Sequence, residues 1–344
     1  MPRWVCDYRQ LNANMVPDNY PLPKINEILS DCARGKIWAK MDMTDSFFQA
    51  RMHPDDVKYM AVSTPQGAFE WLVMPMRFRN SPAIHQRRVA MALQKFIRKI
   101  CHVYLDDIII WSHNLEEHLK NICTIMNALK EAKLYINRNK TELFCYKVNF
   151  LGHKISQNGI EADAMKVNKI LNWPTPKSAT DVRRFLGLVR YLASFLPKLA
   201  VQTEILTALT LKSCERDFPE WKQSHEDAFQ AIKNIVVSRE CLTVIDHEDK
   251  TKKIFVTTDA SDTVSGAVLS FGSCWESARP VAFDSMTFKD AELNYPVHEK
   301  ELLAIMRALR KWKIDLIGSE FFVYTDHKTL LNFDRQKDLS RRQA

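Results

Sequence analysis

Short apolar runs alternate with amphipathic segments along the chain, a pattern that predicts a mixture of strands and helices. Residues 101–113, CHVYLDDIIIWSH, have the character of a buried strand, although Asp106 and Asp107 interrupt the apolar run. Residues 64–67, TPQG, predict a turn between two extended segments. After the aspartate pair, apolar residues recur at spacings of four and three, which predicts a helix with one apolar stripe on a core: Leu115, Leu119, Ile122, Met126 and Leu129.

Two further changes of pattern divide the rest of the chain. Near residue 175 the sequence WPTP breaks the chain, Ser178 with Asp181 predicts a helix cap, and an amphipathic helix follows. Its apolar positions are Val182, Phe185, Leu186, Val189 and Leu192. From about Lys252, IFVTTDAS and SGAVLSF predict strands, a helix is expected from about Glu299 to Leu316, and FFVYTD predicts a last strand. We therefore expect a helical subdomain and then a separate α/β module.

Composition narrows the functional classes. The chain has 344 residues, enough for several cores, and its net charge of +8 favours a polyanionic partner. The eight cysteines form no Cys-x-x-Cys pair, which predicts reduced thiols rather than a disulfide framework or a zinc site. We see no secretory segment and no apolar run of transmembrane length, so we expect no membrane association and an intracellular location, in the cytoplasm or nucleus.

The adjacent aspartates are the first candidate for chemistry, because two like charges in apolar surroundings are costly unless a cation neutralises them. A second strand-like segment carries Asp42 between Met41 and Met43. One distant aspartate and an adjacent pair would suffice for two Mg²⁺ ions, since Mg²⁺ takes hard oxygen ligands and keeps some waters and substrate phosphates. Two metal ions held in this way catalyse nucleotidyl transfer. Taken alone, however, a double aspartate is more often an exposed turn or a salt-bridged edge.

Several motifs in a fixed order make the interpretation specific. The sequence YLDD at 104–107 resembles the Tyr-x-Asp-Asp motif of reverse transcriptases. Four further segments resemble the fingers, palm and primer grip of Gypsy-type long-terminal-repeat retrotransposon polyproteins: CDYRQLN (6–12), YPLPKINEIL (20–29), VMPMRFRNSPAIHQ (73–86) and FLGHKIS (150–156). RRFLGLVRYLASFLP is similar to the thumb, and TTDAS, NYPVHEKELLAI and VYTDHKTL are similar to ribonuclease H. The resemblance spans essentially the whole chain.

The resemblance implies an α+β fold, with a right-hand polymerase of fingers, palm and thumb followed by a connection and a ribonuclease H-like α/β domain. The expected parts are residues 1–156 (partial fingers and palm), 157–212 (helical thumb), 213–251 (connection) and 252–344 (ribonuclease H-like, truncated at its C-terminus). The first fingers strands would precede Met1, and the fourth ribonuclease H carboxylate would follow Ala344. We therefore expect an internal piece of a polyprotein, with no ribonuclease H activity of its own.

In the polymerase part, the resemblance assigns catalysis and metal binding to Asp42, Asp106 and Asp107. Phe47 matches the aromatic gate under the incoming sugar, which disfavours a 2′-hydroxyl. Arg3 matches the fingers arginine that grips the triphosphate, a role that suits a guanidinium. Ordinary strand packing remains the alternative for Phe47, and a solvated terminal charge remains the alternative for Arg3.

The nucleotide pocket shows a departure from the family. Where the family has Pro-Phe-Gly-Leu, this chain has PMRF at 75–78, so Met76 and Arg77 are expected at the nucleotide and the long cation replaces a small residue. A glycine at such a place usually allows a close approach or an unusual backbone angle. Arg77 is therefore expected to obstruct the pocket. Leu151 and Gly152 match the primer grip, although the same sequence also suits a plain hairpin.

The C-terminal module has its own acids, and the resemblance assigns catalysis and metal binding to Asp259, Glu301 and Asp326. The alternative for Glu301 is a helix start, where a negative charge is favoured. The implied cofactor is Mg²⁺, two ions in each active site, with Mn²⁺ as an alternative ion. The implied partners are RNA and DNA template-primers, RNA–DNA hybrids and deoxynucleoside triphosphates.

The expected function is RNA-directed DNA polymerisation by a retrotransposon fragment with an incomplete ribonuclease H domain. Two alternatives remain open. The chain would be a catalytically dead remnant that only binds nucleic-acid duplex, or a fragment that never folds stably. The retained acids favour the enzyme, whereas Arg77 and the missing ends favour the alternatives.

Overall fold

The computed structural model describes residues 5–239 and 241–326, so Arg3 lies outside the described residues. The chain forms two compact units, and each is described by itself. The first holds residues 1–151 and 155–157, and the second holds 152–154 and 158–344. The finer domain boundaries expected at 156, 212 and 251 stay predictions.

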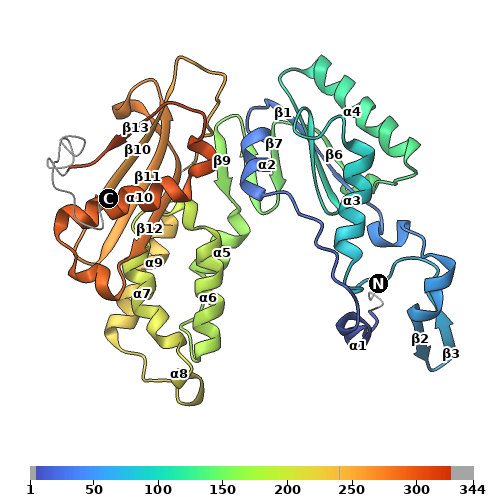
Figure 1. Cartoon of the computed structure of the whole chain (residues 1–344), viewed down its shortest axis with the longest axis horizontal. Coiled ribbons are helices and arrows are strands. Elements are labelled where there is room, and N and C mark those ends of the chain that lie inside the picture. The colour runs from blue at the N-terminus through green and yellow to red at the C-terminus, as the bar shows by residue number, and fades with distance from the viewer. Residues whose placement is uncertain (1–4, 240, 327–344) are drawn as a thin grey trace. The chain divides into compact units, whose positions relative to one another are not determined.

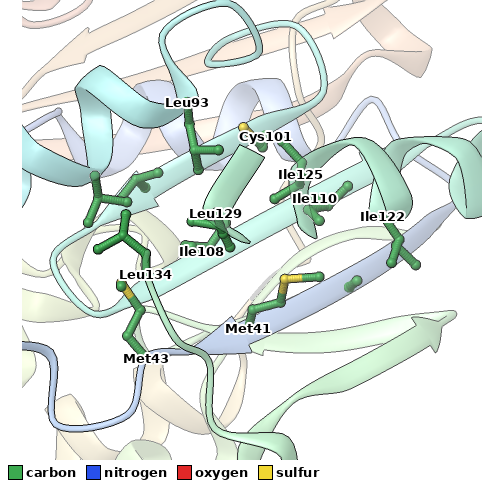
Figure 2. Packing of buried hydrophobic residues seen from close by; sticks show 13 residues of the cluster. Met41, Met43, Leu93, Cys101, Ile108, Ile110, Ile122, Ile125, Leu129 and Leu134 are labelled. Carbon is green, nitrogen blue, oxygen red and sulfur yellow. The ribbon is translucent and has the colours of Figure 1, made fainter. Parts of the chain in front are cut away.

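The first unit is built on an antiparallel sheet in the order β4-β5-β1-β6. Its strands are β1 (Ile37–Asp42), β4 (Cys101–Tyr104), β5 (Asp107–Ser112) and β6 (Glu142–Cys145). Two helices, α3 (Ser81–Leu93) and α4 (Leu115–Glu131), pack against one face and form a cluster with it (Figures 1 and 2). The cluster includes Met41, Leu93, Ile108, Ile110, Ile125 and Leu129.

The other face of the sheet meets α2 (Ile25–Cys32) through polar contacts. The Trp38 indole N–H donates to the Cys32 carbonyl at 2.7 Å, and His102 Nε2 lies 2.8 Å from Asp31 Oδ2. With both faces covered, β5 buries Ile108 to Ser112 without the alternation of a half-exposed strand. This explains the continuous apolar run that follows the two aspartates.

The stripe predicted for α4 is wrong in part. Ile122 and Leu129 are buried, but Leu115, Leu119 and Met126 are exposed. Ile125, His118 and Asn121 take their place on the buried face. The two polar side chains are tolerated there because both contact the Ser112 hydroxyl, His118 Nδ1 at 2.9 Å and Asn121 Nδ2 at 3.0 Å. Apolar spacing alone does not reveal such hydrogen-bonded polar residues.

The remaining elements of the first unit are short. The TPQG turn is confirmed, because β2 and β3 pair with Thr64 opposite Gly67. The bounds are α1 (Arg9–Ala13), η1 (Ser46–Gln49), η2 (Pro54–Met60), β2 (Ala61–Thr64), β3 (Gly67–Glu70), η3 (Arg138–Lys140) and β7 (Lys147–Phe150). A three-stranded sheet joins β7 to β8 (His153–Ser156) and β9 (Gly159–Ala162), where the chain passes from one unit to the other.

The amphipathic helix predicted after Ser178 is confirmed, and it lies in the second unit. Helix α6 begins after Ser178, whose hydroxyl accepts from the Asp181 N–H at 3.1 Å, and it buries Val182, Phe185 and Val189. The helical elements are α5 (Ala164–Leu171), α6 (Ala179–Tyr191), η4 (Ala193–Phe195), α7 (Ala200–Thr207), η5 (Ala208–Thr210), α8 (Ser213–Arg216) and α9 (Gln223–Val237). The cap and the apolar periodicity agree, which is why this segment was predictable.

The second unit also contains a mixed sheet in the order β12-β11-β10-β13, with β10 parallel to β13. Helix α10 lies along one face of this sheet (Figure 1). Ala308 on this helix and Trp312, which follows it, share one buried cluster with Val256 and Leu269. The expected helix 299–316 divides at Trp312. The elements are β10 (Lys253–Ala260), β11 (Val264–Gly272), η6 (Trp275–Ser277), β12 (Arg279–Thr287), η7 (Asp290–Asn294), α10 (Val297–Lys311), α11 (Lys313–Leu316) and β13 (Phe321–Tyr324). None of the helices in the described ranges combines the length and apolar character needed to cross a membrane.

Candidate metal centres

The β4–β5 turn presents Asp106 and Asp107, and a buried glutamine on α3 holds this turn. Leu105, just before the aspartates, adopts a left-handed backbone with φ of 52°. Gln86 Oε1 accepts from the Leu105 N–H at 2.7 Å, and Gln86 Nε2 donates to the Val103 carbonyl at 3.1 Å. Because both bonds are buried or partly buried, Gln86 fixes the conformation that aims the two acids.

Strand β1 places Asp42 directly opposite Asp107 in the antiparallel register with β5. Side chains at such paired positions share one face of the sheet, with Cβ atoms about 5 Å apart. The Met43 N–H also donates to the Asp106 carbonyl at 3.0 Å, so β1 is bonded to the turn itself. The structure therefore brings Asp42 to the aspartate pair, as expected from the sequence.

Each of the three acids has a partner of its own. Lys140 Nζ lies 3.2 Å from Asp42 Oδ1, and Lys40 Nζ lies 3.3 Å from Asp107 Oδ1. The Ser46 hydroxyl donates to Asp106 Oδ1 at 2.7 Å. Burial raises the pKa of Asp107, Lys40 opposes this, and the charges of Asp42 and Asp106 raise it further. The site thus concentrates negative charge that a cation would stabilise.

Phe47 lies beside this centre, in η1, next to Ser46. Its ring meets the His85 ring edge-on at 5.7 Å, and it also packs on a small cluster with Met60 and Met74. His85 is fully buried, and its Nε2 lies 3.7 Å from Asp106 Oδ1. Burial lowers the pKa of His85, which favours a neutral ring under Phe47. The sugar-gate role of Phe47 stays a prediction.

Arg77 adopts a left-handed backbone with φ of 67°, a conformation that favours glycine. Its carbonyl accepts from Asn12 Nδ2 at 2.9 Å, which helps to hold this strained position. The Arg77 side chain is exposed and Met76 is half-buried. The backbone conformation at this position would therefore suit the glycine that the resemblance predicts here. The expected obstruction of a nucleotide pocket by Arg77 stays a prediction.

Leu151 and Gly152 form the two-residue turn between β7 and β8, with φ of 48° and 74°. Positive φ at both positions is typical of a type I′ hairpin turn. A Cβ atom on Gly152 would lie 2.1 Å from Lys166 Nζ and 2.7 Å from the Tyr191 hydroxyl, so the ends of these two side chains would have to shift to admit one. Both the hairpin and a primer-grip role suit these residues, and the latter stays a prediction.

The second centre gathers Asp259 at the end of β10, Glu301 on α10 and Asp326 just after β13. One carboxylate oxygen from each lies within 4.8 Å of the others. Glu301 is only 2% exposed, and its Oε1 accepts from the Ala260 N–H at 3.0 Å. In the described ranges this is the one group of three potential metal ligands at that spacing, so the acids around the β4–β5 turn lie further apart. Three hard oxygen donors at this spacing fit Mg²⁺.

Comparison with known proteins identifies the family. Residues 2–155 match the family model described as reverse transcriptase (RNA-dependent DNA polymerase), and residues 249–344 match the RNase H-like domain found in reverse transcriptase. The retrovirus-related Pol polyprotein from transposon 297 of Drosophila melanogaster is 37% identical over 328 residues, which cover 95% of this chain and 30% of that polyprotein. The transposon Tf2-3 polyprotein of Schizosaccharomyces pombe is 35% identical over 334 residues, which cover 96% of this chain and 24% of that polyprotein.

The chain therefore belongs to the reverse transcriptase and RNase H-like region of long-terminal-repeat retrotransposon Pol polyproteins, and it spans less than a third of these relatives. Solved structures agree on the fold. The foamy viral protease-reverse transcriptase dRH in complex with dsDNA has a TM-score of 0.86 at 25% identity, covering 99% of this chain and 59% of that one. The foamy viral protease-reverse transcriptase in complex with an RNA/DNA hybrid has a TM-score of 0.79 at 24% identity, covering 98% and 46%. The expected right-hand polymerase and RNase H-like fold is confirmed.

The sequence did not reveal four neighbours of the acids. Lys40 had a signal, because it lies two residues before Asp42 in a strand and so shares its face. Lys140, His85 and Gln86 had none, since only the folded sheet and α3 bring them to the acids.

Proposed function

We propose that the chain adds deoxynucleotides to a primer 3′-hydroxyl under the direction of an RNA or DNA template, with Asp42, Asp106 and Asp107 as the metal-binding acids. The observation that supports this best is the pairing of Asp42 with Asp107 beside the Asp106 turn. Two Mg²⁺ ions, or Mn²⁺ in their place, would activate the attacking hydroxyl and stabilise the leaving phosphates. The three carboxylates supply hard oxygen ligands, and burial together with the charges of Asp42 and Asp106 raises the pKa of Asp107, a carboxylate that a cation would therefore stabilise.

The surrounding residues orient these acids and the substrates. Ser46 holds one oxygen of Asp106 and leaves the other for a ligand, as hydrogen-bonded partners of metal-binding carboxylates do. Phe47 would lie under the incoming sugar, Arg3 and Met76 with Arg77 would contact the nucleotide, and Leu151 with Gly152 would hold the primer end. The net charge of +8 supports template-primer binding.

The sequence led us to expect no ribonuclease H activity from this chain, but the three gathered acids of the second centre suit cleavage of RNA in an RNA–DNA hybrid, and we propose it as a further activity. Asp259, Glu301 and Asp326 would hold the Mg²⁺ ions, and the bond from Ala260 to Glu301 fixes the orientation of the buried carboxylate.

Primer extension tests the polymerase. The full chain is incubated with oligo(dT) on poly(rA), dTTP and Mg²⁺, beside Asp106→Asn and a matched control, Asp227→Asn, an exposed acid on α9. We expect extension by the wild type and the control, and a loss of about a thousandfold or more in Asp106→Asn. Equal rates for the wild type and Asp106→Asn would contradict the assignment.

A catalytically dead, duplex-binding remnant is the second candidate, favoured by the strained Arg77 and by the lysines paired with Asp42 and Asp107. It predicts retention of a labelled RNA–DNA duplex in a gel-shift experiment with no extension at any Mg²⁺ or Mn²⁺ concentration.

A further inference from the structure

Lys40 lies on β1 two residues before Asp42, so the two side chains share one face of the strand. Its cross-strand neighbours are Ile109 on β5 and Glu142 on β6. Its ammonium pairs with Asp107 and not with the directly opposite Glu142. The Lys40–Asp107 salt bridge runs diagonally across the sheet and brings a positive charge to the candidate polymerase centre.

The Lys40–Asp107 pair is less exposed than the other pair at this centre. The Lys40 and Asp107 side chains are 24% and 29% exposed, whereas Lys140, which pairs with Asp42, is 59% exposed. An exposed pair is readily broken, and its rupture costs little. Breaking a half-buried pair costs more, because each charge loses its partner where water replaces it poorly.

We propose that Lys40 is a built-in counter-ion that competes with a divalent cation for Asp107 and thereby raises the metal concentration at which the polymerase centre fills. A cation that takes Asp107 as a ligand must first separate the carboxylate from the ammonium. The cost of that separation is subtracted from the binding free energy of the ion. The competition itself does not depend on the proposed function; only the naming of the site as a polymerase centre rests on it.

Direct metal binding tests the competition. Mn²⁺ is titrated into the full chain carrying Asp259→Asn and Glu301→Gln, which remove the second centre, and bound Mn²⁺ is followed by water-proton relaxation. We expect Lys40→Met to lower the half-saturating Mn²⁺ concentration about fivefold, which corresponds to about 1 kcal/mol. Lys40→Arg keeps the charge and should bind as the parent does. Lys252→Met is the matched control, because Lys252 pairs with Asp249 at 3.0 Å in the other unit.

Thermal unfolding gives a second readout. Without metal, Lys40→Met should melt below the parent because Asp107 loses its partner, and added Mg²⁺ should raise its melting temperature more than that of the parent. Lys40→Gln serves as the second variant should the methionine variant not fold. An unchanged Mn²⁺ affinity and an equal Mg²⁺ shift would overturn the proposal, and so would an equal gain in Lys252→Met. Because these measurements need no nucleic acid, a wild type that fails to extend primers contradicts the proposed function and leaves this inference standing.

Discussion

At the scale of single residues, backbone conformation explains features that composition does not. Arg77 and Gly152 both have a positive φ, which costs free energy in the arginine but not in the glycine. The sequence singled out both positions by resemblance, but only the fold shows the positive φ at each. At Gly152 two features favour glycine, a turn conformation and the closeness of Lys166 and Tyr191.

Arg77→Gly should stabilise the first unit by about 0.5–1 kcal/mol, because glycine adopts φ near 67° without the side-chain penalty, although it loses more entropy on folding. It should also increase primer extension, because it places a small residue at the proposed nucleotide site. Urea unfolding and extension rates measure the two effects. Arg98→Gly is the matched control, since Arg98 has φ of 69° and lies outside the assigned site, so it should gain stability alone. Equal extension by Arg77→Gly and the wild type would show that the arginine is accommodated.

Gly152→Ala should destabilise the second unit by about 1–3 kcal/mol, because the new Cβ adds contacts with Lys166 and Tyr191 to the strain of a positive φ. Gly318→Ala separates the two causes, since Gly318 has φ of 78° with no atom within 4 Å of the added Cβ. Urea unfolding measures the loss of unfolding free energy in each variant. The loss in Gly152→Ala minus the loss in Gly318→Ala is the cost of the contacts with Lys166 and Tyr191. Equal losses would mean that Lys166 and Tyr191 move aside at no cost.

At the scale of elements, agreement between several local signals decided which predictions held. The α6 helix had a cap residue and an apolar period, and both were confirmed. The α4 stripe rested on leucine spacing alone and was partly wrong, because His118 and Asn121 are buried through bonds to Ser112. The contact of β8 with α6 had no sequence signal, yet it buries His153 against Tyr191 and Phe195.

His153 makes stability depend on pH. Burial lowers its pKa from 6.5 to about 4, with Lys166 as a further cause. The unfolded chain then binds a proton more readily than the folded chain, so the stabilisation is complete above pH 6.5 and is lost as the pH falls toward 4. Between pH 7 and pH 5 we expect a loss of about 2 kcal/mol from this residue. The variant His153→Phe keeps an aromatic ring at this position but cannot be protonated. Between pH 7 and pH 5, its unfolding free energy in urea should fall by about 2 kcal/mol less than that of the wild type. The same pH dependence in both proteins would refute this.

At the scale of the whole molecule, the order of motifs along the sequence was enough to predict the family and the fold. Asp106 and Asp107 in one unit and Asp259, Glu301 and Asp326 in the other lie within those motifs, and Asp42 lies in a further strand-like segment, so all six could be named as candidates in advance. The charges that balance them were not predictable as a set. Lys140 comes from a different segment, and only the pairing of β1 with its neighbours brings it to Asp42.

The two candidate metal centres lie in different compact units, so their activities should be lost separately. Glu301→Gln removes one buried ligand of the Asp259–Glu301–Asp326 group while keeping the size of the side chain. We expect it to reduce cleavage of a labelled RNA–DNA hybrid by about a hundredfold or more, and to leave primer extension on poly(rA) within about twofold of the wild type. Asp106→Asn should give the reverse pattern in the same two assays. Loss of both activities in either variant would show that the units do not act independently, and a wild type that extends primers but cleaves no hybrid would show that the three acids of the second centre do not suffice.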